Sequence, residues 1–110
     1  MGYREMTLKR MWKTNSMLKD LMHTDKGKDY VARLAAQVSR TDYSQLEENP
    51  FRVIMVFKEE IRRIKGDKPK NPKEWIKRVF YKNMINNAIK LSYKIAAEEQ
   101  EKNLYRRRYW

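Results

Sequence analysis

The chain has 110 residues, of which 36% are charged, and its 26 lysines and arginines against 14 aspartates and glutamates give a net charge of +12 at pH 7. A chain of this length forms one domain with a thin core, which leaves little volume for a deep active-site cavity. The absence of cysteine excludes disulfides, thiolate chemistry and zinc–sulfur sites, and the chain lacks the run of about 18 apolar residues that a membrane-spanning helix needs.

Two helices are predicted in the first 40 residues. Between residues 3 and 22 the apolar side chains recur at spacings of three and four, which predicts an amphipathic helix. With its lysines and Trp12 this helix could lie on a membrane surface, although such a stripe more often faces a core. Residues 28–40 carry a second apolar face with small alanines, and a polar, turn-rich stretch follows them. The apolar positions of the first helix are Leu8, Met11, Trp12, Leu18, Leu21 and Met22.

The stretch 50–83 contains the clearest start and stop signals of the chain. Asn49-Pro50 opens a helix, because asparagine caps free amide groups and proline suits the first helical position. Gly66 is a natural end for that helix. Asn71-Pro72 opens the next helix in the same way, and Glu74 stands three residues after Asn71, as in a capping box. The stretch therefore predicts a hairpin of two helices joined by a short basic loop.

The second helix of this hairpin is predicted to continue towards Tyr105, with a kink or break favoured at 86–87, where two asparagines compete for their own backbone. The whole pattern contains four or five helices and no strand. It predicts an all-α fold, a small antiparallel or irregular bundle with short loops. We expect a single domain, 1–110, composed of an N-terminal helical extension (1–48), a helical core (49–105) and a basic, aromatic tail (106–110).

Catalytic constellations are scarce. His23 is the single histidine and falls in a predicted turn, without a serine or cysteine nucleophile pattern beside it. The carboxylate pairs at 47–48, 59–60 and 98–99 are chain neighbours, which point about 100° apart on a helix and so do not converge. The three glycines do not form a phosphate-binding loop. We therefore expect no enzymatic activity, no metal site and no cofactor of the chain's own.

Cations are concentrated between residues 62 and 94, where Asp67 and Glu74 are the acidic residues that oppose them. Such a run suits phosphate contacts with DNA or RNA, and it equally suits docking to an acidic protein. A degenerate helix-turn-helix over residues 31–46 is one version of the nucleic-acid hypothesis, with Arg33 and Arg40 to face the groove. The candidate residues for binding an acidic partner are Arg62, Arg63, Lys65, Lys68, Lys70, Lys73, Lys77, Arg78 and Lys82.

Two segments of the hairpin resemble the LYR-motif family of small mitochondrial helical proteins, over roughly residues 49–105. In that family a Leu-Tyr-Arg tripeptide opens the first helix, and the second helix carries a hydrophobic-Arg-x-x-Phe-Arg-x-Asn signature. Here Phe51-Arg52 opens the first helix, with Pro50 in the place of the leucine. In the second signature Phe80 and Asn83 match, whereas Tyr81 stands at the usual arginine position.

The resemblance implies an accessory or scaffold subunit of a mitochondrial multiprotein assembly, with a respiratory-chain complex favoured, on the matrix side of the inner membrane. Many family members bind acyl carrier protein, whose acyl-phosphopantetheine chain lies between their helices while basic side chains face the carrier. By resemblance, the residues that would line the acyl chain are Phe51, Arg52, Phe57 and Phe80; each phenylalanine taken singly also suits an ordinary core. The alternative is a small basic helical nucleic-acid-binding protein, ribosomal or phage-encoded and regulatory. Peripheral membrane contact is compatible with either.

Overall fold

The computed structural model describes residues 3–24 and 26–109, with the backbone alone for 105–109. Its regular structure is entirely helical, which confirms the predicted all-α bundle. The side chains of the basic, aromatic tail at 106–110 lie outside the described residues. In chain order the elements are the 3₁₀ turn η1 (Tyr3–Glu5), α1 (Leu8–Leu21), α2 (Gly27–Ser39), the 3₁₀ turn η2 (Tyr43–Gln45), α3 (Pro50–Lys65) and α4 (Pro72–Tyr109).

The helix starts follow the capping signals of the sequence. The side-chain oxygen of Asn49 accepts a hydrogen bond from the backbone N–H of Arg52 at 3.1 Å. Asn71 accepts in the same way from the N–H of Glu74 at 2.9 Å. Each bond satisfies one of the amide groups that a helix start leaves without an intrahelical partner. Gly66 follows α3 as predicted, although its φ of −79° is right-handed rather than left-handed.

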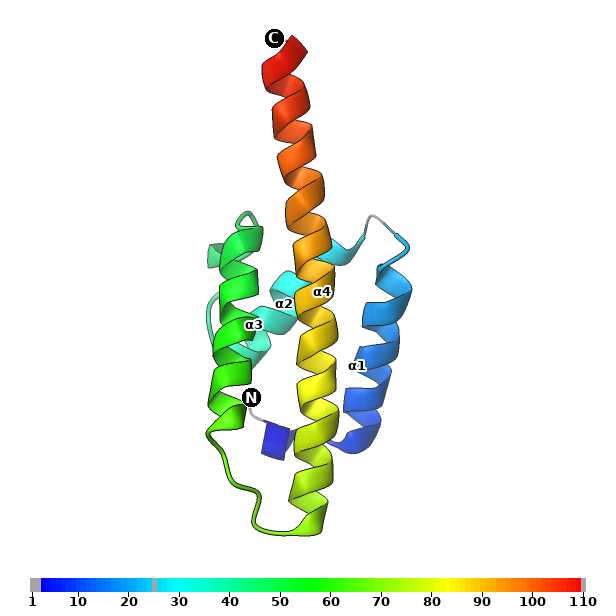
Figure 1. The fold of residues 1–110 in the computed structure, drawn as a ribbon, viewed down its shortest axis with the longest axis vertical. Helices are drawn as coiled ribbons and strands as arrows, with labels where there is room; N and C mark the ends of the chain where they lie inside the picture. Colours follow the sequence, from blue (N-terminus) through cyan, green and yellow to red (C-terminus); the bar gives the residue numbers. More distant parts are fainter. Residues whose placement is uncertain (1–2, 25, 110) are drawn as a thin grey trace.

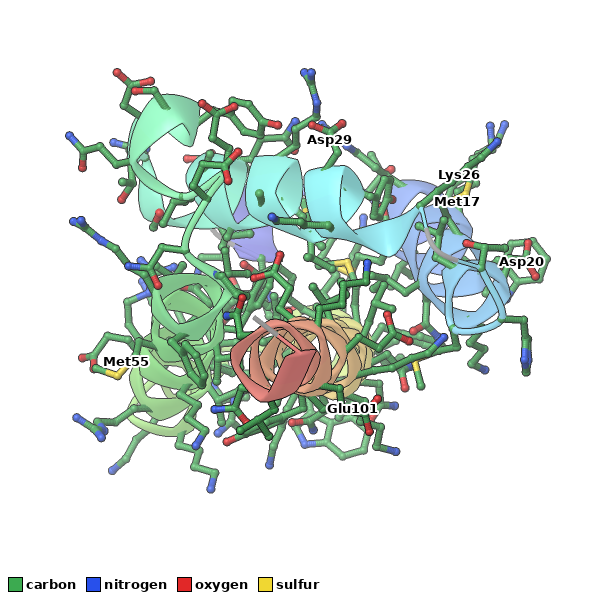
Figure 2. The ribbon with its side chains drawn as sticks, turned by 90° about the horizontal axis from the view of Figure 1, so that it is seen from above. Met17, Asp20, Lys26, Asp29, Met55 and Glu101 are labelled. Atoms are coloured by element: carbon green, nitrogen blue, oxygen red, sulfur yellow. The ribbon has the colours of Figure 1, made fainter. Side chains whose placement is uncertain are left out.

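The long helix α4 is the axis of the bundle. Figure 1 shows α3 and α1 on either side of it, with α3 antiparallel and α1 parallel to α4. The short helix α2 crosses on one side of α4, between α1 and α3, as the view along the bundle in Figure 2 shows. None of the helices that the structure describes covers the opposite side of α4 (Figure 2).

One hydrophobic core joins all four helices. Residues 3–46 contribute Met11, Leu18 and Ala35, which are almost fully buried, so the predicted N-terminal extension packs as an integral part of the bundle. The α2–α4 contact is close, because a Cβ added at Gly27 would lie 3.0 Å from a methyl group of Leu91. The α4 side chains of this core are Tyr81, Met84, Ile85, Ala88, Leu91 and Ile95.

The helix α4 runs without a break through residues 86–87, so the predicted kink is wrong. The side-chain amide of Asn87 donates to the side-chain oxygen of Asn15 on α1, and Asn86 is exposed. Because Asn87 bonds across the helix pair, it does not compete for its own backbone. The last turns of α4 extend beyond the other helices (Figure 1), which gives the molecule extents of 58 × 24 × 20 Å. Within the described ranges no helix is both long and apolar enough to cross a membrane.

Candidate interaction surface

The nine cations proposed from the sequence gather where α3 passes into α4; we call this surface the basic end. It includes the last turn of α3, the loop 66–71 and the first three turns of α4 (Figure 1). Six of the nine side chains are exposed, and the other three are partly buried. The exposed ones are Arg62, Arg63, Lys65, Lys68, Lys70 and Lys73, and the partly buried ones are Lys77, Arg78 and Lys82.

Three of these cations also make contacts within the molecule. The Nε of Arg78 donates to the backbone carbonyl of Ile64 at 3.2 Å and so caps the carboxyl end of α3. The amino group of Lys77 donates to the carbonyl of Arg4 at 3.4 Å. Arg63 contacts the buried carboxylate of Glu60 at 2.5 Å. Cations suit a helix carboxyl end because its carbonyl groups carry partial negative charge.

The two acidic residues inside the basic run are engaged within the molecule. The carboxylate of Asp67 accepts a hydrogen bond from the hydroxyl of Tyr3, and Arg4 pairs with it at 3.0 Å. The hydrogen bond from Tyr3 holds the pKa of Asp67 below its usual value, and the charge of Arg4 adds to this effect. Glu74 accepts from the backbone N–H of Lys70 at 2.9 Å. Both carboxylates are therefore engaged by partners other than the amino groups of the neighbouring lysines.

Four exposed lysines of the basic end have no ion pair with any side chain that the structure describes. They lie on the last turn of α3, on the loop and on the first turn of α4: Lys65, Lys68, Lys70 and Lys73. Ammonium groups without an intramolecular partner are available to pair with the carboxylates of another molecule. This cluster is therefore the part of the basic run best placed to bind an acidic surface.

An open cleft of about 390 Å³ lies beside the basic end. Three arginines line it, and each has a carboxylate partner: Arg4 with Asp67, Arg63 with Glu60, and Arg40 with Glu5 at 3.8 Å. The cleft is thus close to electrostatic balance. Sequence reasoning missed Arg4 and Arg40 here because no local pattern connects residues so far apart along the chain.

The predicted acyl-lining residues do not share one inner face. Phe57 is fully buried, but Phe51 is 53% exposed and Phe80 is 45% exposed, so these two do not face the core beside Phe57. Arg52 is exposed as well, with its guanidinium 3.4 Å from the side-chain oxygen of Gln45. On α4 the buried position is Tyr81, and its chain neighbour Phe80 points about 100° away from it.

The interior between α2, α3 and α4 is closed. The cavity there measures about 10 Å³ and is lined by side chains such as Val31, Leu46, Val53 and Ile95. A cavity of this size is at the limit for one water molecule, so the bundle as it stands has no room for an acyl chain at that place.

A buried polar network occupies the position that differs from the LYR signature. The hydroxyl of Tyr81 donates to Glu60 at 2.9 Å, and Arg63 contacts the same carboxylate oxygen. Burial raises the pKa of Tyr81, and the charge of Glu60 raises it further, so the phenol stays protonated. The network satisfies a carboxylate that is almost completely buried, which fits a structural role.

The helix-turn-helix prediction for residues 31–46 is wrong in its second half. After α2 the chain forms only the three-residue 3₁₀ turn η2 before α3 begins, so this segment has no second α-helix to enter a major groove. Arg33 pairs with Asp29 at 2.8 Å, and Arg40 adopts a left-handed backbone with a φ of 55°.

Comparisons with protein-family models, with curated proteins and with solved structures returned no match for this chain. The resemblance to the LYR-motif family therefore stays a prediction from the residues at 51–52 and 76–83.

Proposed function

We propose that this protein is a non-catalytic accessory or scaffold subunit that docks through its basic end onto an acidic surface of a larger protein assembly. The observation that supports this proposal is the cluster Lys65, Lys68, Lys70 and Lys73, exposed and without ion pairs among the described residues. The carboxylates nearest in sequence, Asp67 and Glu74, are bound within the fold.

Hydrogen bonds hold in place the helix ends and the loop that carry these lysines, which favours binding of a partner. Arg78 links the start of α4 to the end of α3, and Asn71 caps the first turn of α4. Asp67 fixes the loop to the N-terminal 3₁₀ turn through Tyr3 and Arg4. A surface held in place before binding loses less conformational entropy when a partner docks, and its positive charge accelerates the encounter with an acidic partner.

The LYR resemblance suggests a mitochondrial setting for this role, in an assembly of the respiratory chain on the matrix side of the inner membrane. Acyl carrier protein is an acidic partner of suitable charge for the basic end. The closed interior favours a contact with the surface of the carrier over a chain threaded between the helices. The proposal therefore concerns the carrier's acidic face, and acyl-phosphopantetheine is not required for it.

Co-purification and titration with acyl carrier protein test this proposal. The variant Lys68→Glu/Lys70→Glu should weaken binding by about tenfold, because like-charge repulsion replaces attraction at the interface. The matched control is Lys26→Glu/Lys102→Glu, which changes the net charge equally at exposed positions of α2's start and the far part of α4. It should change the affinity by no more than about twofold. Equal losses in both variants, or no binding by the native chain, would contradict docking through the basic end.

Nucleic-acid binding is the second candidate, because four neighbouring ammonium groups also suit phosphates. The binding constant for RNA or DNA should then fall steeply with salt, with a logarithmic slope of about −0.9 for each phosphate neutralised on duplex DNA. The same Lys68→Glu/Lys70→Glu variant should lower that slope. A steep salt dependence together with no capture of the carrier would favour this candidate over the accessory role.

A further inference from the structure

A second surface of the molecule combines exposed aromatic and aliphatic side chains with lysines. It lies on the side of α1 and α4 that α2 and α3 leave uncovered, and we call it the α1–α4 face (Figure 1). Its most exposed member is Trp12, at 66%. Its apolar residues are Leu8 and Trp12 on α1 and Ile76, Val79 and Phe80 on α4.

The register of the two helices brings these residues together. α1 and α4 run parallel, and Asn15 contacts Asn87 across a sequence separation of 72. The amino group of Lys94 donates to the carbonyl of Met22 at the same separation of 72. Leu8 and Phe80 have this separation too, and each lies seven residues, or about two helical turns, before an asparagine of the pair. They therefore lie side by side, with Trp12 one turn further along α1.

The same segments contain no acidic residue. Neither residues 8–19 of α1 nor residues 75–97 of α4 include an aspartate or a glutamate. The exposed side of α4 carries asparagine and lysine between its apolar residues, and α1 adds further lysines. The exposed lysines of the two segments are Lys9, Lys13, Lys19 and Lys90. The face thus combines apolar side chains with positive charge only.

We propose that the α1–α4 face binds the surface of an anionic lipid bilayer, with Trp12, Phe80 and their neighbours inserted among the headgroups and the lysines at the lipid phosphates. Aromatic and aliphatic residues beside lysines are the composition of helices that lie in a bilayer interface. Protein interfaces, in contrast, are depleted of lysine and enriched in arginine. The proposal uses residues outside the free lysine cluster of the basic end and does not depend on the function proposed above.

Sedimentation with vesicles tests this assignment in the full chain. The native protein should bind vesicles of phosphatidylcholine and phosphatidylglycerol in equal parts, and it should bind pure phosphatidylcholine vesicles at least about tenfold more weakly. Trp12→Ala/Phe80→Ala should lower binding to the mixed vesicles by about tenfold or more. The matched control is Phe51→Ala/Met55→Ala, which removes two exposed apolar side chains from α3, 53% and 68% exposed. Met55 points away from α4 at the outer edge of the bundle (Figure 2). This control should bind within about twofold of the native chain.

A reporter variant makes the result independent of the folding of the alanine variants. Trp75→Phe/Trp110→Phe leaves Trp12 as the single tryptophan, because the chain has three. Its fluorescence should shift to the blue on mixed vesicles and be quenched by brominated lipid. Failure of the native chain to bind mixed vesicles, or an unshifted Trp12 emission on bound protein, would overturn the proposal. Self-association of the native chain without lipid would also overturn the proposal if the Trp12→Ala/Phe80→Ala variant abolished it. The face would then be an interface between two copies.

Discussion

Phe57 and Phe80, which the resemblance assigns to the same acyl-lining role, have different surroundings in the fold. Phe57 packs at the centre of the core with no exposed surface, whereas Phe80 is almost half exposed on the α1–α4 face. The difference arises because α4 buries Tyr81, whose hydroxyl is satisfied by Glu60, and a helix turns its next residue about 100° away. Phe80 therefore falls outside the arc of α4 that faces the core, whereas the adjacent Met84 and Ile85 both fall inside it.

Replacing each of these two side chains by alanine should distinguish a core position from a surface position. Phe57→Ala is expected to lower the free energy of unfolding by about 3–5 kcal/mol, because it leaves a cavity in a closed core. Phe80→Ala should change it by no more than about 0.5 kcal/mol. Urea unfolding followed by circular dichroism measures both values. Similar losses in the two variants would show that Phe80 is part of the core.

The contact of Asp67 with Tyr3 and Arg4 makes stability depend on pH. The pKa of Asp67 is lowered in the folded state, first by the hydrogen bond from Tyr3, so the unfolded chain takes up this proton more readily. The stabilisation is fully present above the unfolded value of about 3.9 and is lost as the pH falls through the lower folded value.

Asp67→Asn should therefore lower the melting temperature at neutral pH and make it less sensitive to acid below about pH 4. The melting temperature of the native chain and of the variant, measured between neutral pH and pH 2, gives the comparison. Asp20→Asn is a suitable control, because Asp20 is exposed at the outer side of α1 (Figure 2). The idea fails if Asp67→Asn follows the native curve in parallel over the whole acid range.

At the scale of the elements, the starts of the helices were predictable because their signals are local. Asn49-Pro50 and Asn71-Pro72 combine a capping side chain with a residue that needs no amide partner, and both work as the sequence indicates. The outward direction of Trp12 and Phe80 was not predictable, since it depends on which side of α4 is covered by α2 and which is left open.

Contacts between residues far apart in the sequence could not be predicted from local patterns either. The bond between Asn15 and Asn87 engages one of the two successive asparagines at which a kink or break was predicted, and no local signal connects the two residues. The candidate basic end was predictable as a run of cations. Its division into structural ties, such as Arg78 to Ile64, and free lysines required the fold, because the ties depend on how α3 meets α4.

The cap at Asn71 gives a test at this scale. Asn71→Ala should lower the free energy of unfolding by about 1 kcal/mol, because the N–H of Glu74 loses its acceptor at the start of α4. Asn83→Ala is the matched control on the same helix, since Asn83 is exposed in the interior of α4 and alanine is the better helix former. Chemical unfolding of both variants measures the difference. The control should be neutral or slightly stabilised, and a loss as large as that of Asn71→Ala would argue against the cap.

For the molecule as a whole, α4 divides into a part inside the bundle and a part beyond it. Among the side chains that the structure describes, the last buried ones on α4 are Ile95 and Ala96, and Glu99 pairs with Lys28 of α2 at 2.5 Å. The described side chains that follow, Gln100 to Leu104, are exposed, and the backbone continues as a helix to Tyr109 (Figure 1). The bundle therefore draws its stability from α4 up to Glu99.

Two truncations should reveal this division. Removal of residues 102–110 is expected to change the melting temperature by no more than about 3 °C, while the ellipticity at 222 nm falls with the lost helical turns. Removal of residues 94–110 deletes Ile95, Ala96 and the Lys28–Glu99 pair, and should lower the melting temperature by about 10 °C or more. Thermal melts followed by circular dichroism measure both. A large loss in the shorter truncation would mean that the last turns of α4 stabilise the bundle, either by contact with it or by association with a second chain, which the oligomeric state in solution distinguishes.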